Sequence, residues 1–301
     1  MTPPKPDTMA ARDDRAAFLS LAAEHYENFP VGSILVPKRL RPHMHRIYAF
    51  ARIADDIADE RRDAALLEAF RADFLEHVGG APSRPLPLFA DLAVTLRELD
   101  LPVDLFTDLL DAFAQDLEVR RYATADELFA YCRLSADPVG RLVLRVFGHR
   151  DPALDALSDR ICTGLQLLNH LQDIREDLLE RDRVYFPLAD LQRYGVSEDA
   201  LRGSHADPAV RALVECWLDR TMTLFAEGWP LTAAVGGRLK LELRAIVGAA
   251  CLAARRIQAA GHDVLAGRVR LSRFDHVRAL CGACVGRRPV PLRARRSEER
   301  A

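Results

Sequence analysis

The sequence predicts an all-α protein, a single helical bundle around one enclosed core, and three observations carry that prediction. Ala, Leu, Glu and Arg recur at spacings of three and four residues, which is the repeat of one helix face. Alternating apolar and polar runs, which would indicate β-strands, are scarce. The 301 residues are 49% hydrophobic and 29% charged, a composition typical of a globular chain that buries a sizeable core.

The starts of the helices are predicted from capping residues and prolines. Asp151 and Asp207 each precede a proline, so each can cap a helix whose first position that proline takes. Thr124 and Glu127 have the spacing of a capping box. The breaker-rich segment 79–87 is predicted to be a surface loop within one domain, because the composition is alike on both sides of it. We expect about ten helices, among them 42–60, 124–136, 151–180, 208–225 and 238–261.

The domain prediction is one helical domain over residues 1–286, followed by a polar, arginine-rich tail over 287–301. The formal net charge of −2 gives no global attraction to nucleic acid. The apolar stretch 245–254 is about half as long as a membrane span, and the first residues contain no apolar signal region. We therefore expect a cytoplasmic protein whose basic tail could touch the inner, anionic face of the membrane.

A first acidic face is predicted on the helix over residues 42–60. Tyr48, Arg52, Asp55 and Asp59 are spaced by four, three and four residues, which places them on one face. Like charges four residues apart destabilise a helix by about 0.2–0.5 kcal/mol. A bound cation would offset this cost, whereas the alternative is an acidic surface patch without a function.

A second acidic face is predicted on the helix over residues 151–180. Gln166, Asn169, Asp173 and Asp177 are spaced by three, four and four residues. Mg²⁺ prefers oxygen ligands and typically joins one or two carboxylates to the phosphates of a substrate. Two such faces with a diphosphate between them would form a clamp, in which the planar fork of Arg52 could also bind the diphosphate.

These segments resemble the squalene and phytoene synthases. YAFARIADDIADE, which begins at Tyr48, is similar to the first aspartate-rich motif of that family. NHLQDIREDLLERDRVYFP, which begins at Asn169, is similar to the second motif. The runs that begin at Tyr131 (YCR) and Pro138 (PVG) resemble the middle motif. The resemblance extends over most of residues 26–187.

The resemblance implies an isoprenoid synthase fold with a central apolar cavity, a requirement for Mg²⁺ and a prenyl diphosphate substrate. It assigns the metal to Asp55, Asp59, Asn169, Asp173 and Asp177. It assigns substrate binding to Ser33, Tyr48, Arg52, Gln166 and Arg183. It places Tyr48 and Tyr131 near the reacting carbons, as candidate catalytic residues. Tyr48, Tyr131 and Phe50 could face a carbocation, and core packing is the alternative for each of them. We expect His170 to be a structural or surface residue and Trp217 to be a packing residue.

Details within the motifs favour one branch of the family. ENFPVGS, which begins at Glu27, and YCRLSADPVGR, which begins at Tyr131, resemble the bacterial hydroxysqualene synthases. Gln172 stands where many relatives have an arginine, which counts against the condensation of two diphosphates. The resemblance then implies a carbon–oxygen lyase of the hopanoid pathway that converts presqualene diphosphate, supplied by a presqualene diphosphate synthase, into hydroxysqualene.

Three alternatives stay open from the sequence. The first is head-to-head condensation of two prenyl diphosphates to presqualene diphosphate, squalene or phytoene. The second is reduction of the final cation to squalene by a nicotinamide cofactor, although no dinucleotide fingerprint is visible. The third is a non-catalytic assembly factor, which is disfavoured because the key aspartates are all present.

Overall fold

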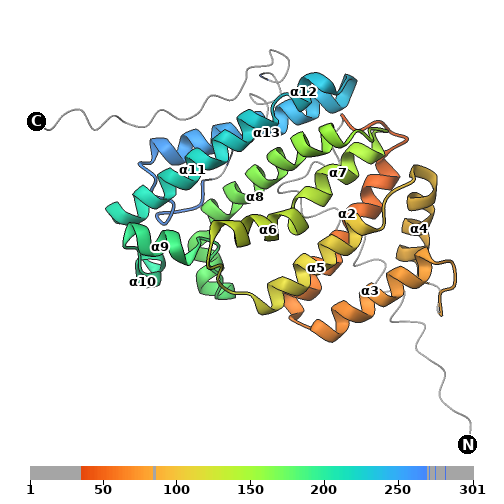
Figure 1. The fold of residues 1–301 in the computed structure, drawn as a ribbon, viewed down its shortest axis with the longest axis horizontal. Coiled ribbons are helices and arrows are strands. Elements are labelled where there is room, and N and C mark those ends of the chain that lie inside the picture. The colour runs from red at the N-terminus through yellow and green to blue at the C-terminus, as the bar shows by residue number, and fades with distance from the viewer. Residues whose placement is uncertain (1–34, 84–85, 270, 272–274, 276–281, 283–301) are drawn as a thin grey trace, which may run out of the picture. The chain divides into compact units, whose positions relative to one another are not determined.

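The computed structural model describes residues 35–83, 86–269, 271, 275 and 282 (Figure 1). The chain divides into two compact units, with the boundary between Leu101 and Pro102. Within the described residues the secondary structure is helical, apart from one isolated parallel bridge between Arg121 and Val184. The predicted all-α class is confirmed.

The described residues of the first unit form three α-helices and one π-helical turn. Its elements are α2 (Arg41–Asp56), η1 (Ile57–Arg61), α3 (Ala64–Val78) and α4 (Pro87–Leu99). Phe50 on α2 is fully buried, and its ring centroid lies 4.8 Å from that of Phe74 and 5.3 Å from that of Phe70. Phe89 of α4 completes this cluster. Phe50 is therefore a core residue, the alternative that the sequence left open.

The second unit is organised around one long helix, α8, which has 30 residues. Helices α6, α7, α10, α11, α12 and α13 all pack against α8, and α11 runs alongside it (Figure 1). This arrangement buries a core that includes Trp217, Phe225 and Ile161. The helices in the described part of this unit are α5 (Asp104–Glu118), α6 (Ala125–Ser135), α7 (Asp137–Val146), α8 (Pro152–Arg181), α9 (Leu188–Tyr194), α10 (Glu198–Arg202), α11 (Pro208–Gly228), α12 (Leu231–Ala234) and α13 (Gly237–Ala259).

The predicted helix starts are confirmed by their hydrogen bonds. The side chain of Asp151 accepts from a backbone N–H in the first turn of α8, and Asp207 does the same for α11. Thr124 accepts from the N–H of Glu127, while the Glu127 carboxylate accepts from the N–H of Ala123. These bonds satisfy donors that the first helical turn leaves open.

Some predictions concern segments that the structure describes only in part. Apart from Pro87, which begins α4, the described residues of the segment 79–87 lie between α3 and α4, and most of them are exposed, as a surface loop should be. The tail over 287–301 lies outside the described residues, so the predicted domain limits stay a prediction. Among the helices described, none is both long enough and apolar enough to cross a membrane.

Candidate active site

The first acidic motif lies on α2 and on the π-helical turn that follows it. Tyr48, Arg52 and Asp55 belong to α2, as predicted. Asp59 belongs to η1, where hydrogen bonds span five residues instead of four. The α-helical spacing that we assumed between Asp55 and Asp59 is therefore wrong. Turns of this kind are frequent at functional sites, and the spacing of the sequence gives no signal for one.

Arg52 forms ion pairs with several acidic side chains of the first motif. Its Nη1 lies 2.8 Å from the carboxylate of Asp55, and its Nη2 lies 2.7 Å from that of Asp56. Glu60 is also within ion-pair distance, at 3.6 Å from Nη2. Sequence reasoning missed Asp56 and Glu60, although both follow Arg52 at multiples of four residues. One guanidinium thus holds three carboxylates of the first motif.

The hydroxyl of Tyr48 remains protonated at neutral pH. Partial burial raises its pKa, and the nearby Asp55 and Asp56 add to the rise, while Arg52 opposes it. A protonated phenol is a hydrogen-bond donor, which suits a group facing an anionic ligand. The substrate-binding role that the resemblance implies for Tyr48 stays a prediction.

The second acidic motif lies on α8, next to the chain that follows α13. The carboxylate of Asp173 lies 2.9 Å from Nε of Arg268. The neighbouring residue Gln172 also contacts this chain segment: its side-chain amide donates to the carbonyl of Val269 at 2.8 Å. Sequence reasoning missed Arg268, because nothing local links it to a motif so far away in the chain.

Asp177 has a strongly perturbed pKa. Burial raises its pKa to about 7, and Asp173 adds to the rise, while Arg181 and Arg183 oppose it. Nη1 of Arg181 lies 3.3 Å from its carboxylate. Two carboxylates one turn apart, one of them poorly solvated, form an environment that a cation would stabilise.

The oxygen donors of both motifs fit Mg²⁺. Within the described ranges, no group of three or more His, Cys, Asp or Glu side chains is arranged around a common metal position. Mg²⁺ does not need such a group, because it commonly takes one or two carboxylates and completes its shell with waters and substrate phosphates. Asn169, half-buried on α8, offers a further oxygen. Ser33 lies outside the described residues.

The C-terminal end of α8 is held by Arg121. Its Nε and Nη2 lie 2.6 and 2.7 Å from the two carboxylate oxygens of Glu198. Its Nη2 also donates to the carboxylate of Asp182 at 2.9 Å, and its Nη1 to the Asp182 carbonyl. Asp182 has a positive φ of 53°, which ends the helix. This network directs the chain from α8 into the residues that follow, Arg183 and Tyr185.

Asp116 connects two predicted site residues. The hydroxyl of Tyr131 donates to its carboxylate at 2.8 Å, and Nη2 of Arg183 donates to its backbone carbonyl at 3.0 Å. Burial raises the pKa of Tyr131 well above its ordinary value, so this hydroxyl stays a donor. Sequence reasoning missed Asp116, which lies outside every motif.

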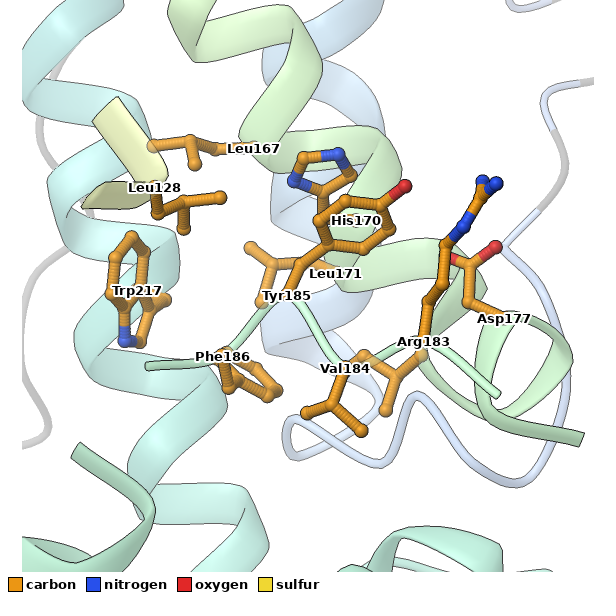
Figure 2. A pocket seen from close by; sticks show the side chains of 11 residues that line it. Leu128, Leu167, His170, Leu171, Asp177, Arg183, Val184, Tyr185, Phe186 and Trp217 are labelled. Carbon is orange, nitrogen blue, oxygen red and sulfur yellow. The ribbon is translucent and has the colours of Figure 1, made fainter. Parts of the chain in front are cut away.

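A pocket opens beside α8 in the second unit (Figure 2). Figure 2 shows Asp177 and Arg183 together at one side and the apolar side chains Leu128 and Leu167 at the other. The pocket is thus polar at one end and apolar elsewhere. Its lining residues are Leu128, Leu167, His170, Leu171, Ile174, Asp177, Arg183, Val184, Tyr185, Phe186 and Trp217.

His170 lies in this pocket. Its ring stacks on Tyr185 with the two centroids 3.6 Å apart and the planes within 3°. Its Nε2 lies 3.1 Å from Nε2 of Gln166. Burial lowers its pKa to about 3, and Arg183 adds to the effect, so the imidazole is neutral at physiological pH. The prediction that His170 is merely structural or on the surface did not anticipate this position. Trp217 is buried as predicted, yet it also lines the pocket.

Comparisons with known proteins agree on one family. A sequence model described as "Squalene/phytoene synthase" matches residues 22–275. A hydroxysqualene synthase of Rhodopseudomonas palustris is 36% identical over 258 residues, 85% of this chain and 87% of that protein. A phytoene synthase of Thermus thermophilus is 33% identical over 284 residues, 92% of this chain and 95% of that protein. Among solved structures, squalene synthase HpnC from Alicyclobacillus acidocaldarius has a TM-score of 0.75 and 38% identity, covering 85% of this chain and 97% of that one.

Proposed function

Because the chain belongs to the squalene/phytoene synthase family, we propose that it converts presqualene diphosphate into hydroxysqualene and releases diphosphate. The proposal is supported by its similarity to a hydroxysqualene synthase over most of both chains. The main structural observation behind the proposal is the pocket of the second unit, whose lining combines apolar side chains with the charged side chains of Asp177 and Arg183. The chemical character of this lining matches a substrate with a hydrocarbon part and a diphosphate.

Mg²⁺ is part of the proposal, and its ligands would be Asp55, Asp59, Asn169, Asp173 and Asp177. When bound, the ion supplies positive charge that stabilises the diphosphate as it leaves. The assignment is supported by the raised pKa of Asp177 and by the carboxylate oxygens in both motifs. Binding the leaving group more tightly as its charge grows lowers the barrier of the reaction.

The chain's own residues would bind, orient and shield the substrate. The planar guanidinium of Arg183, whose Nη2 is held by the Asp116 carbonyl, matches a phosphate oxygen pair. Tyr48 and Arg52 would bind the diphosphate from the first motif. The rings of Tyr131 and Tyr185 lie 5.9 Å apart, and their faces would attract a carbocation by about 0.5–2 kcal/mol.

A second candidate is the head-to-head condensation of two prenyl diphosphates. It is supported by the phytoene synthase of Thermus thermophilus, which matches 92% of this chain. Gln172 weighs against it: it donates to the carbonyl of Val269 and carries no charge for a second diphosphate. A non-catalytic assembly factor is a weaker candidate, because both acidic motifs retain their carboxylates.

The deciding experiment is a product assay with the purified protein and Mg²⁺. With presqualene diphosphate, we expect hydroxysqualene and an equal amount of diphosphate, and a chelator should abolish both. With farnesyl diphosphate alone, we expect no consumption. Consumption of farnesyl diphosphate without a partner enzyme would support the condensing activity instead. Squalene formed only when a reduced nicotinamide is added would support the reductive alternative.

The proposal also concerns where the substrate comes from. A presqualene diphosphate synthase would supply it, and both the substrate and the product are lipids with little solubility in water. We therefore propose a cytoplasmic protein that makes peripheral contact with the inner face of the membrane. Sedimentation with vesicles of anionic lipid tests this contact, and equal sedimentation with neutral vesicles would argue against an electrostatic attraction.

A further inference from the structure

Nδ1 of His170 is a buried polar atom in an otherwise apolar part of the pocket. Within the described residues, it has no hydrogen-bond partner. The other ring nitrogen, Nε2, is 3.1 Å from the side-chain nitrogen of Gln166. Because an amide nitrogen donates, Nε2 must accept, and the proton of the neutral ring is then on Nδ1. Buried donors in proteins are normally satisfied, which predicts a small hydrogen-bonding molecule at this position.

The ring is held in a fixed orientation. Tyr185 stacks on one face at 3.6 Å, and Gln166 lies one helical turn before His170 on α8. Figure 2 shows the imidazole behind the Tyr185 ring, between Leu167 and the side of the pocket formed by Asp177 and Arg183. A molecule bound to Nδ1 would therefore lie within the same pocket as the hydrocarbon part of a substrate.

Three polar side chains near this pocket already have a structural hydrogen bond or lie at its acidic end. The hydroxyl of Tyr131 donates to the carboxylate of Asp116, and Arg183 donates to the Asp116 carbonyl. Asp177 lies with Arg183 at the end that the proposed function assigns to the diphosphate (Figure 2). His170 thus offers a buried hydrogen-bonding atom that can hold a small molecule against the apolar wall.

We propose that Nδ1 of His170 binds the water molecule that becomes the hydroxyl group of the product. This inference rests on the proposed function and adds the residue that determines which product forms. In the reaction, the C–O bond to diphosphate breaks and its electron pair leaves with the diphosphate. A lone pair of the bound water forms the new C–O bond to the cation. The proton lost by the resulting oxonium goes to an oxygen of the released diphosphate.

The test compares three substitutions that treat the two ring nitrogens differently. His170→Phe keeps a flat ring against Tyr185 but removes both nitrogens. His170→Asn keeps a polar atom near the position of Nδ1, and His170→Gln keeps one near Nε2. His205→Phe is the control, because it removes an exposed imidazole that does not line the pocket and leaves His170 in place. Each variant is incubated with presqualene diphosphate and Mg²⁺, and released diphosphate, alcohol and hydrocarbon are measured separately.

For the Phe and Gln variants, we expect the ratio of alcohol to hydrocarbon to fall by at least about tenfold, because loss of one hydrogen bond to the water is worth about that factor. Without the bound water, the cation loses a proton and forms a C30 polyene. Release of diphosphate should fall by less than about threefold, since His170 does not bind the leaving group. The Asn variant should retain much of the alcohol, and the control should keep the ratio of the natural chain.

Two results would overturn the inference. One is an unchanged alcohol ratio in the Phe variant, and the other is equal loss of alcohol in the Phe and Asn variants, which would indicate a structural role. If the Phe variant does not fold, a high-resolution crystal structure of the natural protein decides: an ordered water within hydrogen-bond distance of Nδ1 supports the inference, and an empty position contradicts it. If the natural protein makes no alcohol at all, the proposed function fails first, which is a separate result.

Discussion

The acids of the second motif are balanced by a cation from the far end of the chain. Arg268 lies 2.9 Å from Asp173, and Asp177 lies one turn further along α8. Each carboxylate is destabilised by the other, so the arginine offsets part of that repulsion. A divalent cation at the same carboxylates would take over this role.

Replacing Arg268 should therefore make stability depend more strongly on Mg²⁺. In chelator, Arg268→Gln should lower the free energy of unfolding by about 1 kcal/mol, the size of a partly exposed ion pair. Added Mg²⁺ should restore most of this loss. Arg160→Gln is the control, because Arg160 and its partner Glu227 lie outside both motifs and the pair is exposed. Urea unfolding with and without Mg²⁺ measures both variants, and an Arg268 defect that Mg²⁺ leaves unchanged would contradict the explanation.

Asp137 should make the protein less stable as the pH rises. It is 3% exposed, and burial raises its pKa to about 7, with Asp159 adding to the rise. Its ordinary value is near 4, so the folded state holds the proton more tightly than the unfolded state. Its contribution is then greatest below about pH 4 and is lost as the pH rises towards 7, on the order of 2–4 kcal/mol in total.

Asp137→Asn removes this titration and keeps the acceptor for Thr163, whose hydroxyl donates to Asp137 at 2.8 Å. We expect the variant to be more stable than the natural chain at pH 8 and to show a smaller loss of stability between pH 5 and pH 8. Asp177 titrates in the same direction, so part of the loss remains. Urea unfolding at both pH values measures the difference. The exposed Asp126→Asn is the control, and an equal effect there would refute the assignment to Asp137.

At the scale of elements, the sequence predicted the helices well and their irregularities poorly. Local signals fixed the start of α8 at Asp151 and that of α11 at Asp207, because a cap and a proline act within one turn. The π turn at Ile57–Arg61 left no such signal. The face shared by Asp55 and Asp59 was predicted from an ideal helix, and the extra residue in that turn is what the spacing could not reveal.

The approach of α8 and α11 depends on a glycine that the sequence did not single out. A Cβ atom on Gly228 would lie 2.8 Å from the backbone carbonyl of Leu157 and 2.6 Å from the side chain of Ile161. The Leu157 carbonyl belongs to the backbone and cannot move away by a change of side-chain rotamer, so α8 and α11 would have to separate. Overpacking costs about 1–3 kcal/mol, while alanine is favoured over glycine in a helix by about 1 kcal/mol.

Gly228→Ala should therefore lower the free energy of unfolding by about 1–2 kcal/mol, in spite of the better helix former. Gly236→Ala is the matched control, because a Cβ atom there meets nothing within 4 Å and its φ of −106° suits any residue. Its cost should be a few tenths of a kcal/mol at most, from a poorer N-cap. Thermal and urea unfolding compare the two, and equal stability of both variants would show that α8 and α11 can separate freely.

At the scale of the whole molecule, the fold and the family followed from the sequence, and the long-range contacts of the site did not. The isoprenoid synthase fold implied by the two motifs is confirmed by the solved relative from Alicyclobacillus acidocaldarius. The contacts of Arg268 with Asp173 and of Tyr131 with Asp116 join residues far apart in the chain. They depend on how the helices pack, which helical periodicity does not specify.

The two motifs belong to different compact units, and the proposed function requires both to bind one ligand. Binding to the folded state alone raises stability, by about 2.7 kcal/mol when the ligand is at 100 times its Kd. Mg²⁺ with inorganic diphosphate should therefore raise the melting temperature of the natural chain. Asp55→Asn, in the first unit, and Asp173→Asn, in the second, should each remove most of that rise and lower turnover by at least about a hundredfold, while the chain still folds.

If both motifs bind the same ligand, either substitution alone already removes its binding. The double variant, Asp55→Asn with Asp173→Asn, should therefore lose little more of the thermal shift than either single variant. Asp91→Asn, an exposed acid on α4 outside the motifs, is the control and should keep the full thermal shift. Thermal unfolding with and without the ligands is measured for the natural chain, the two single variants and the double variant, which together form a double-mutant cycle. Effects of Asp55→Asn and Asp173→Asn that simply add would mean that each motif binds its own ligand, and a shared diphosphate would then be excluded even if both variants were inactive.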